Sequence, residues 1–144
     1  MTTPSELKKI EQARDYVRDS RNKTQVWALM TVTGDSRLKL FKKGKEYDEL
    51  FQFLGEDDMG FVYAKIITGD EVSRRDKFVL ITWVGPNVSA VKKGKMLLPR
   101  SEIDKIFDQR AKVIEATDLS ELDYGKVSEI LVKAGGADYG SSTS

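Results

Sequence analysis

Two consecutive segments in the middle of the chain limit its possible folds more than any other feature. Residues 60–68 read GFVYAKIIT, and residues 77–84 read KFVLITWV. Both are rich in residues that favour β-strands. The second is almost continuously apolar, which is typical of a strand covered on both faces, because a solvated face would carry polar residues at alternate positions. We therefore expect this strand inside a sheet that has other layers packed on each side.

Helical and strand patterns alternate along the rest of the chain. Thr3, Pro4 and Glu6 predict the capped first turn of a helix that runs to about residue 19. Residues 26–33 and 37–41 alternate around Gly34-Asp35 and predict a hairpin at one edge of the sheet. After a loop at 42–45, we expect a helix at 47–54 that is ended by Gly55, and a loop at 69–76. Helical segments are expected at 88–98 and after Pro99, and the second of these has an inward apolar stripe that includes Ala111. A strand at 112–116 and a last helix capped by Asp123 complete the chain.

This order predicts a mixed α/β (α+β) fold, in which a central mixed sheet of five or six strands carries helices on both faces. A chain of 144 residues that is 40% hydrophobic can bury a core without metals or disulfides. We expect one domain over residues 1–134, with the large aromatic residues of the strands in its core. Residues 135–144 (GGADYGSSTS) have too little apolar content to pack and are expected to form a flexible tail.

Composition argues against most catalytic and nucleic-acid functions. The chain has no cysteine and no histidine, so it lacks thiolate nucleophiles, the commonest general base and the usual ligands of transition metals. It also lacks the glycine-rich loops that hold nucleotide phosphates. The net charge of +1 provides no overall field for nucleic acid or anionic lipid. We expect no enzymatic activity, no cofactor, no metal, no nucleic acid and no stable membrane association, in a cytoplasmic protein without a signal peptide.

Specific motifs point to a family. Residues 68–90 (TGDEVSRRDKFVLITWVGPNVSA) combine T-G-D, a basic pair, K-F, I-T-W and G-x-N-V-S, and residues 133–139 read KAGGADY. Together with the order of elements, this pattern closely resembles the coactosin subgroup of the ADF-homology (ADF-H) domain family, over nearly the whole chain. The resemblance implies a gelsolin-like fold and a monomeric cytoskeletal protein. It also implies binding to the sides of filamentous actin, interference with barbed-end capping and no enzymatic activity.

The resemblance also implies which residues bind. Actin is acidic, so a partner needs cations held rigidly at the contact. Lys77 is the first candidate, because it matches the lysine that coactosins are thought to use, and Arg74 and Arg75 adjoin it. A second surface is expected on the helix after Pro99, opposite its apolar stripe, and comprises Arg100, Ser101, Asp104, Lys105 and Lys112. Lys95, with Lys92 and Lys93, is expected to add a basic rim. Solvated surface charges have the same pattern, and this alternative stays open.

Other functions within the same family also stay open. Cofilins sever filaments and carry a markedly basic long helix, whereas here Glu102, Asp104 and Asp108 interrupt the corresponding segment. An ADF-H module can instead have a main partner other than actin, in an Arp2/3-type or enzyme-scaffolding role, because a fold does not fix a function. A second protein partner is compatible with either interpretation. Binding of anionic lipid through the two KKGK segments is disfavoured by the low net charge.

Overall fold

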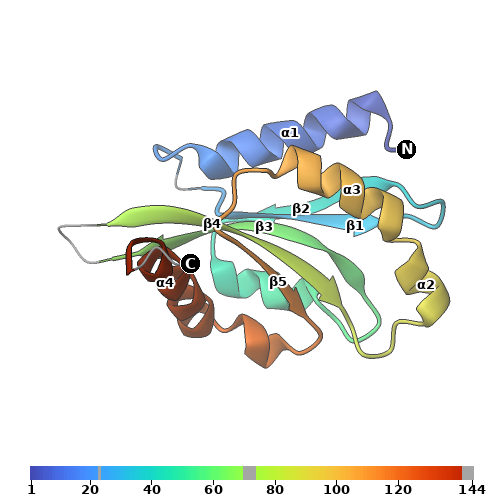
Figure 1. Ribbon diagram of the computed structural model, residues 1–144. Coiled ribbons are helices and arrows are strands. Elements are labelled where there is room, and N and C mark those ends of the chain that lie inside the picture. Colours follow the sequence, from blue (N-terminus) through green and yellow to red (C-terminus); the bar gives the residue numbers. More distant parts are fainter. Residues whose placement is uncertain (23, 70–73, 141–144) are drawn as a thin grey trace.

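A five-stranded sheet separates two layers of helices (Figure 1). The computed structural model describes residues 1–22, 24–69 and 74–140, with side chains through residue 134. The strand order is β2-β1-β3-β4-β5. The strands are β1 (Trp27–Val32), β2 (Leu38–Gly44), β3 (Met59–Thr68), β4 (Arg75–Val84) and β5 (Lys112–Ala116). The predicted mixed sheet is confirmed, because β4 pairs antiparallel with β3 and parallel with β5.

The helices divide between the two faces of the sheet. One face is covered by α1 (Pro4–Arg18) and α3 (Leu97–Ile106), which contribute to one buried cluster. The other is covered by the 3-10 helices η1 (Tyr47–Phe53) and η2 (Leu119–Leu122) together with α4 (Tyr124–Gly140). The short helix α2 (Ala90–Gly94) precedes α3 at the end of the sheet where β4 ends (Figure 1). Helices on both faces were predicted, and this prediction is confirmed.

Strand β4 is buried from Phe78 to Trp83, as its apolar sequence predicts. Successive side chains of a strand point to opposite faces. Accordingly Phe78 and Leu80 belong to the cluster under α1 and α3, whereas Val79, Ile81 and Trp83 belong to the cluster under η1 and α4. The predicted core aromatic residues are buried in these two clusters: Trp27, Phe61, Tyr63, Phe78 and Trp83.

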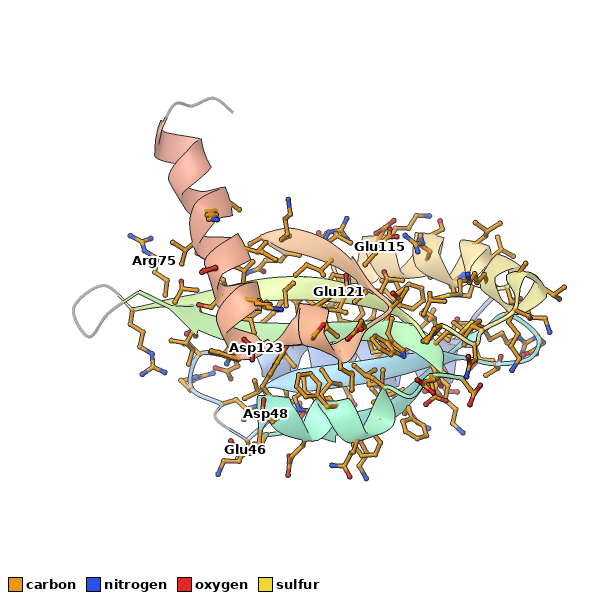
Figure 2. The ribbon with its side chains drawn as sticks, turned by 90° about the horizontal axis from the view of Figure 1, so that it is seen from below. Glu46, Asp48, Arg75, Glu115, Glu121 and Asp123 are labelled. Carbon is orange, nitrogen blue, oxygen red and sulfur yellow. The ribbon has the colours of Figure 1, made fainter. Side chains whose placement is uncertain are left out.

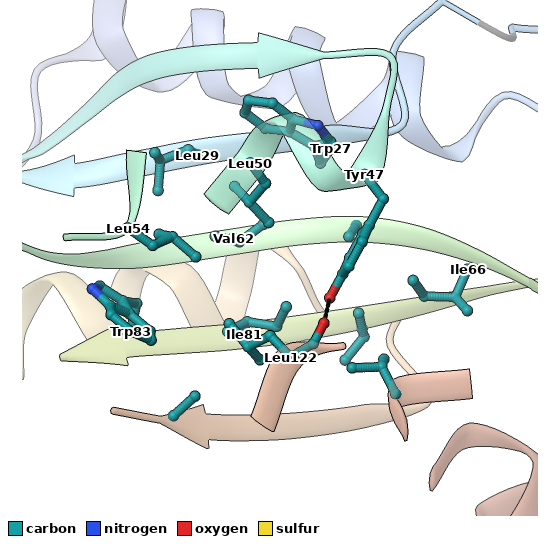
Figure 3. Packing of buried hydrophobic residues seen from close by; sticks show 14 of the residues in the cluster. Trp27, Leu29, Tyr47, Leu50, Leu54, Val62, Ile66, Ile81, Trp83 and Leu122 are labelled. Carbon is teal, nitrogen blue, oxygen red and sulfur yellow. Dashed lines mark hydrogen bonds between the residues drawn. The ribbon is translucent and has the colours of Figure 1, made fainter. Parts of the chain in front are cut away.

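Tyr47 links the two helical segments on the second face (Figure 3). Its side chain extends from η1, and its hydroxyl donates a hydrogen bond of 2.6 Å to the carbonyl oxygen of Leu122 in η2. Burial raises the pKa of Tyr47, so the neutral form that donates this bond is favoured. The bond gives a partner to a phenol that would otherwise be buried without one.

The N-terminal segment closes the outer edge of β2. The predicted caps at Thr3 and Pro4 are confirmed, since the hydroxyl of Thr3 accepts a hydrogen bond from the amide of Glu6 at 3.3 Å. Glu6 does not complete a capping box. Its carboxylate accepts the amide of Leu40 in β2 at 2.8 Å, and the buried hydroxyl of Thr2 accepts the amide of Leu38 at 2.9 Å. These bonds occupy amides that an edge strand would leave free.

Thr2 also holds α3. Its hydroxyl donates to Glu102 at 2.6 Å, and its amide donates to the same carboxylate at 3.1 Å. One residue thus joins the N-terminal segment to β2 and to α3, across a separation of 100 positions along the chain.

Several predicted boundaries differ from the structure. Residues 42–44 were expected in a loop but continue β2, because lysines on an edge strand can face water without leaving the sheet. The helix at 47–54 is the 3-10 helix η1, which is capped by Leu54 rather than Gly55. The expected helical break occurs at Lys95 and Met96, before Pro99, which lies in the first turn of α3 where its missing N–H is not needed.

Three further boundaries concern loops and helix ends. Of the loop expected at 69–76, residues 70–73 lie outside the described residues, and Arg75 and Asp76 belong to β4. Helix α3 ends at Ile106, so Ala111 is not part of its inward stripe. The carboxylate of Asp123 accepts the amide of Lys126 at 3.3 Å, which confirms the predicted cap of α4.

Helix α4 continues past the predicted domain boundary. Val127 and Leu131 are fully buried. The helical backbone extends to Gly140, whereas the domain was predicted to end at residue 134. Residues 141–144 of the predicted tail lie outside the described residues. The division into a domain at 1–134 and a flexible tail at 135–144 stays a prediction.

We predict that Thr2→Val lowers the free energy of unfolding by about 1–3 kcal/mol, because the amide of Leu38 loses its acceptor in a site where Thr2 is only 4% exposed. Urea denaturation measures this as a lower midpoint with an unchanged slope. Ser5→Ala, which removes an exposed hydroxyl from the same segment, is the matched control and leaves the midpoint unchanged. Equal midpoints for the two variants would contradict a stabilising role for the hydrogen bonds that Thr2 makes with β2 and α3.

Candidate functional site

The first predicted cations lie where β4 begins. Arg74 precedes the strand, Arg75 opens it, and Lys77 is its third residue. Arg74 and Arg75 are exposed, and Lys77 is half-buried beside the buried Phe78. These placements agree with the sequence prediction, except that Arg75 extends from the strand itself and not from a loop.

The pairing of β4 determines which face carries these cations. Lys77 pairs with Ile66 of β3, and residues directly opposite each other on neighbouring strands point to the same face. Ile66 belongs to the buried cluster under η1 and α4. Lys77 therefore lies on the α4 face of the sheet, and Arg75, two residues earlier, shares this face. Figure 2 places Arg75 at the end of the sheet that α4 approaches.

Lys112 belongs with these cations and not with α3. It was expected on the exposed face of the helix, but α3 ends at Ile106 and Lys112 is the first residue of β5. Lys112 pairs with Val79, so it points to the α4 face, diagonally across from Lys77. We call Arg75, Lys77 and Lys112 the strand-end cluster. The structure brings these three predicted residues together and separates them from the candidates on α2 and α3.

Helix α3 presents a different surface. Pro99, Ile103 and Ile106 pack inward. Ser101 and Lys105 are exposed and lie one turn apart, as predicted. Asp104, in contrast, forms an ion pair with Arg110, at 3.1 Å between the carboxylate and the guanidinium. Arg100 is half-buried and forms an ion pair of 3.1 Å with Glu115 of β5.

Three exposed apolar side chains of α2 and α3 were missed at the sequence level. Val91 of α2 is 76% exposed, and Leu97 and Leu98 of α3 are 73% and 67% exposed. Leu97 lies one turn before Ser101, so the two leucines continue the exposed stripe of α3. We call Leu97, Leu98, Ser101 and Lys105 the α3 stripe. Its position follows from the inward residues 99, 103 and 106, whose helical spacing leaves residues 97 and 98 facing outward.

The three lysines of the predicted basic rim differ in their exposure. Lys92 and Lys93 are exposed on α2, whereas Lys95 is half-buried where α2 ends. Lys92 and Lys95 border a groove of about 610 Å³ that also contains Phe41 and Trp83. A second groove, of about 640 Å³, lies between α3 and β5 and is bordered by Arg100 and Glu115 among others.

Arginines of α1 fix the C-terminal end of α3. Arg14 donates to the carbonyl oxygen of Ile106 at 3.2 Å. Arg18 donates to the hydroxyl of Tyr63 at 3.0 Å and to Asp108 at 3.1 Å. The hydrogen bond from Arg18 lowers the pKa of Asp108, whereas burial raises the pKa of Tyr63. Together with the hydrogen bonds from Thr2 to Glu102, these contacts hold α3 at its middle and at its C-terminal end.

The described residues show neither a metal-binding cluster nor a membrane-spanning helix. No group of three or more Asp and Glu side chains within residues 1–22, 24–69 and 74–134 is arranged to hold a metal ion. None of the helices that the structure describes has the length and apolarity needed to span a membrane.

The fold agrees with comparisons to known proteins. The family of cofilin/tropomyosin-type actin-binding proteins matches residues 5–131. The chain belongs to this family. Within it, the chain is 31% identical to the coactosin-like protein of Bos taurus over 143 residues, which is 99% of both chains. The resemblance to coactosins drawn from residues 68–90 is thereby confirmed.

Solved structures of this actin-binding family superpose well. The crystal structure of coactosin from Entamoeba histolytica has a TM-score of 0.79 at 25% identity, and covers 88% of this chain and 93% of that one. The solution structure of mouse coactosin, described as an actin filament binding protein, has a TM-score of 0.75 at 28% identity, and covers 92% of both chains. The ADF-H fold predicted from the sequence is confirmed.

We predict that Lys112→Glu stabilises the protein by about 0.2–1 kcal/mol, because it replaces like-charge repulsion inside the strand-end cluster with attraction to Lys77. Urea denaturation at low salt measures the gain, and added salt reduces it. The same substitution in a Lys77→Ala background is the control, and there the gain is smaller. An equal gain in both backgrounds would place Lys112 away from Lys77.

Proposed function

We propose that this protein binds the sides of actin filaments, as a coactosin-like regulator, through the strand-end cluster and the α3 stripe together. The proposal is supported most directly by the placement of the two surfaces on elements that pack together: the cluster lies on the α4 face of the sheet, and the α3 stripe lies on a helix that covers the opposite face. The cluster lies where β4 begins, and α2 and the start of α3 lie near its other end (Figure 1). Ten residues of extended strand span about 33 Å, so the surfaces can contact different subunits.

Two separated contacts favour a polymer over a free subunit. Each surface alone offers few side chains, but once one is engaged the other faces its target at a high effective concentration. Only a filament holds neighbouring subunits in a fixed arrangement. A weak affinity for monomers and a stronger affinity for filaments follow from this geometry.

The two surfaces contribute different kinds of interaction. Arg75, Lys77 and Lys112 supply positive charge for an acidic partner, and their strands hold them without a large loss of freedom on binding. Leu97 and Leu98 supply apolar area that is exposed in the free protein and is removed from water at a contact. Binding is therefore sensitive to salt through the cluster and insensitive to it through the leucines.

The finer points of function are also proposals. We propose a monomeric protein of the cytoplasm and cytoskeleton that has no enzymatic activity and opposes barbed-end capping without severing. Membership in an actin-binding family supports the absence of catalysis. Glu102 and Asp104 support the distinction from severing, because these acidic residues offset the positive charge of Arg100 and Lys105 within α3. Arg74, Arg100 and Lys95 remain candidate contacts at the margins of the two surfaces.

High-speed co-sedimentation with assembled actin tests the proposal as a whole, with monomeric actin as the comparison. The folded protein is expected to pellet with filaments. If it stays in the supernatant at modest ionic strength, filament binding is excluded.

Lys77→Ala is expected to weaken filament binding at least tenfold, equivalent to about 1.4 kcal/mol, because the loss leaves a partner carboxylate without its cation. Co-sedimentation over a range of actin concentrations measures the change, and circular dichroism checks the fold. Lys39→Ala removes the same charge from the exposed side of β2 and is expected to bind normally. Full binding by the Lys77 variant would remove Lys77 from the site.

Leu98→Ser is expected to weaken filament binding about tenfold at low and high salt alike, because burial of one leucine contributes about 1.5–3 kcal/mol. The side chain is exposed, so the free energy of unfolding stays within about 0.5 kcal/mol of the original. Tyr16→Ser removes a comparably exposed apolar side chain from α1 and serves as the control. Normal binding by the Leu98 variant would exclude the α3 stripe.

A further inference from the structure

One ion pair at the edge of the α3 stripe differs from the other ion pairs of α3 and its C-terminal end. Arg110 pairs with Asp104 and also donates to the carbonyl oxygen of Phe107 at 3.2 Å. Arg18 pairs with Asp108 and also donates to Tyr63. These two guanidiniums are anchored to the fold by a second bond.

Arg100 has no such second anchor within the described residues. Its guanidinium donates to Glu115 at 3.1 Å, and this is the hydrogen bond that the structure gives it. The two side chains are 37% and 68% exposed, so both remain accessible to solvent. Exposed ion pairs of this kind contribute little to stability. The pair between Arg100 and Glu115 can therefore open without disturbing the packing beneath it.

The location of the pair connects it to the proposed contact. Arg100 precedes Ser101 of the α3 stripe, and Glu115 lies on β5 at the outer edge of the sheet, beside α3 (Figure 2). Both border the groove of about 640 Å³, which Leu97 also lines. A partner that covers the α3 stripe must approach this ion pair.

We propose that Glu115 is an internal competitor for Arg100, which occupies the guanidinium until a carboxylate of the filament displaces it. This inference rests on the proposed function and assigns a regulatory role to a residue outside the two surfaces. Glu115 lowers filament affinity, because each binding event must first open the internal pair. It also keeps Arg100 paired in the free protein, so that the cation does not bind other anions.

A simpler electrostatic effect makes a different prediction. If Glu115 only repels an acidic partner, its removal strengthens binding whether or not Arg100 is present. If it competes for Arg100, its removal has an effect only when Arg100 is there. A double-mutant cycle separates the two, because it isolates the coupling between the residues.

The test measures co-sedimentation with filamentous actin for the wild type, Glu115→Gln, Arg100→Ala and the double variant, all checked for native circular dichroism. Glu115→Gln is expected to bind about threefold more tightly at low salt, the scale of an exposed ion pair. Arg100→Ala is expected to bind more weakly, and Glu115→Gln is expected to change nothing in that background. Glu11→Gln, an isosteric loss of the same charge on α1, is the matched control and leaves binding unchanged.

Three outcomes overturn the inference: unchanged or weaker binding by Glu115→Gln, an equal gain in the Arg100→Ala background, or the same gain from Glu11→Gln. A wild-type protein that does not pellet overturns the proposed function itself. The variants test the inference and the wild-type protein tests the proposed function, so one experiment distinguishes the failure of each.

Discussion

Between Phe78 and Trp83 no residue of β4 faces water, and both buried clusters of the molecule contain its side chains. Phe78 and Leu80 pack into the cluster under α1 and α3. Val79, Ile81 and Trp83 pack into the cluster under η1 and α4. Neither helical layer can pack without this strand, since each covers one of its faces. The backbone of Lys77 is held for the same reason, because it pairs with β3 and leads directly into the part of the strand that is buried on both faces.

Much of this architecture follows from local sequence patterns. The apolar run of β4, the Thr3 cap and the Asp123 cap were predicted correctly, because each depends on residues that are close together along the chain. The extension of β2 into residues 42–44 was not predicted, since lysines on an edge strand have the composition of a loop. The role of Glu6 was also missed, because its partner Leu40 is distant in sequence and becomes a neighbour only through the fold.

The candidate site likewise combines features that local sequence predicts with features that depend on the fold. The position of Lys77 at the head of β4 follows directly from the motif that contains it. The face that Lys112 occupies does not, because it depends on the parallel register between β4 and β5, which no local pattern specifies. The exposure of Leu97 and Leu98 was not predicted, because only charged residues were considered as binding candidates. The spacing of the inward residues of α3 is enough to predict that these two leucines face solvent.

The hydrogen bonds that join Thr2 to β2 and α3 also bear on the order of folding. They connect positions up to 100 apart, so they cannot all form until β2 and α3 have been brought together by the rest of the chain. Closing so long a loop yields contacts only at a late stage. We therefore expect docking of Thr2 onto α3 to be a late step of folding and its release to be an early step of unfolding.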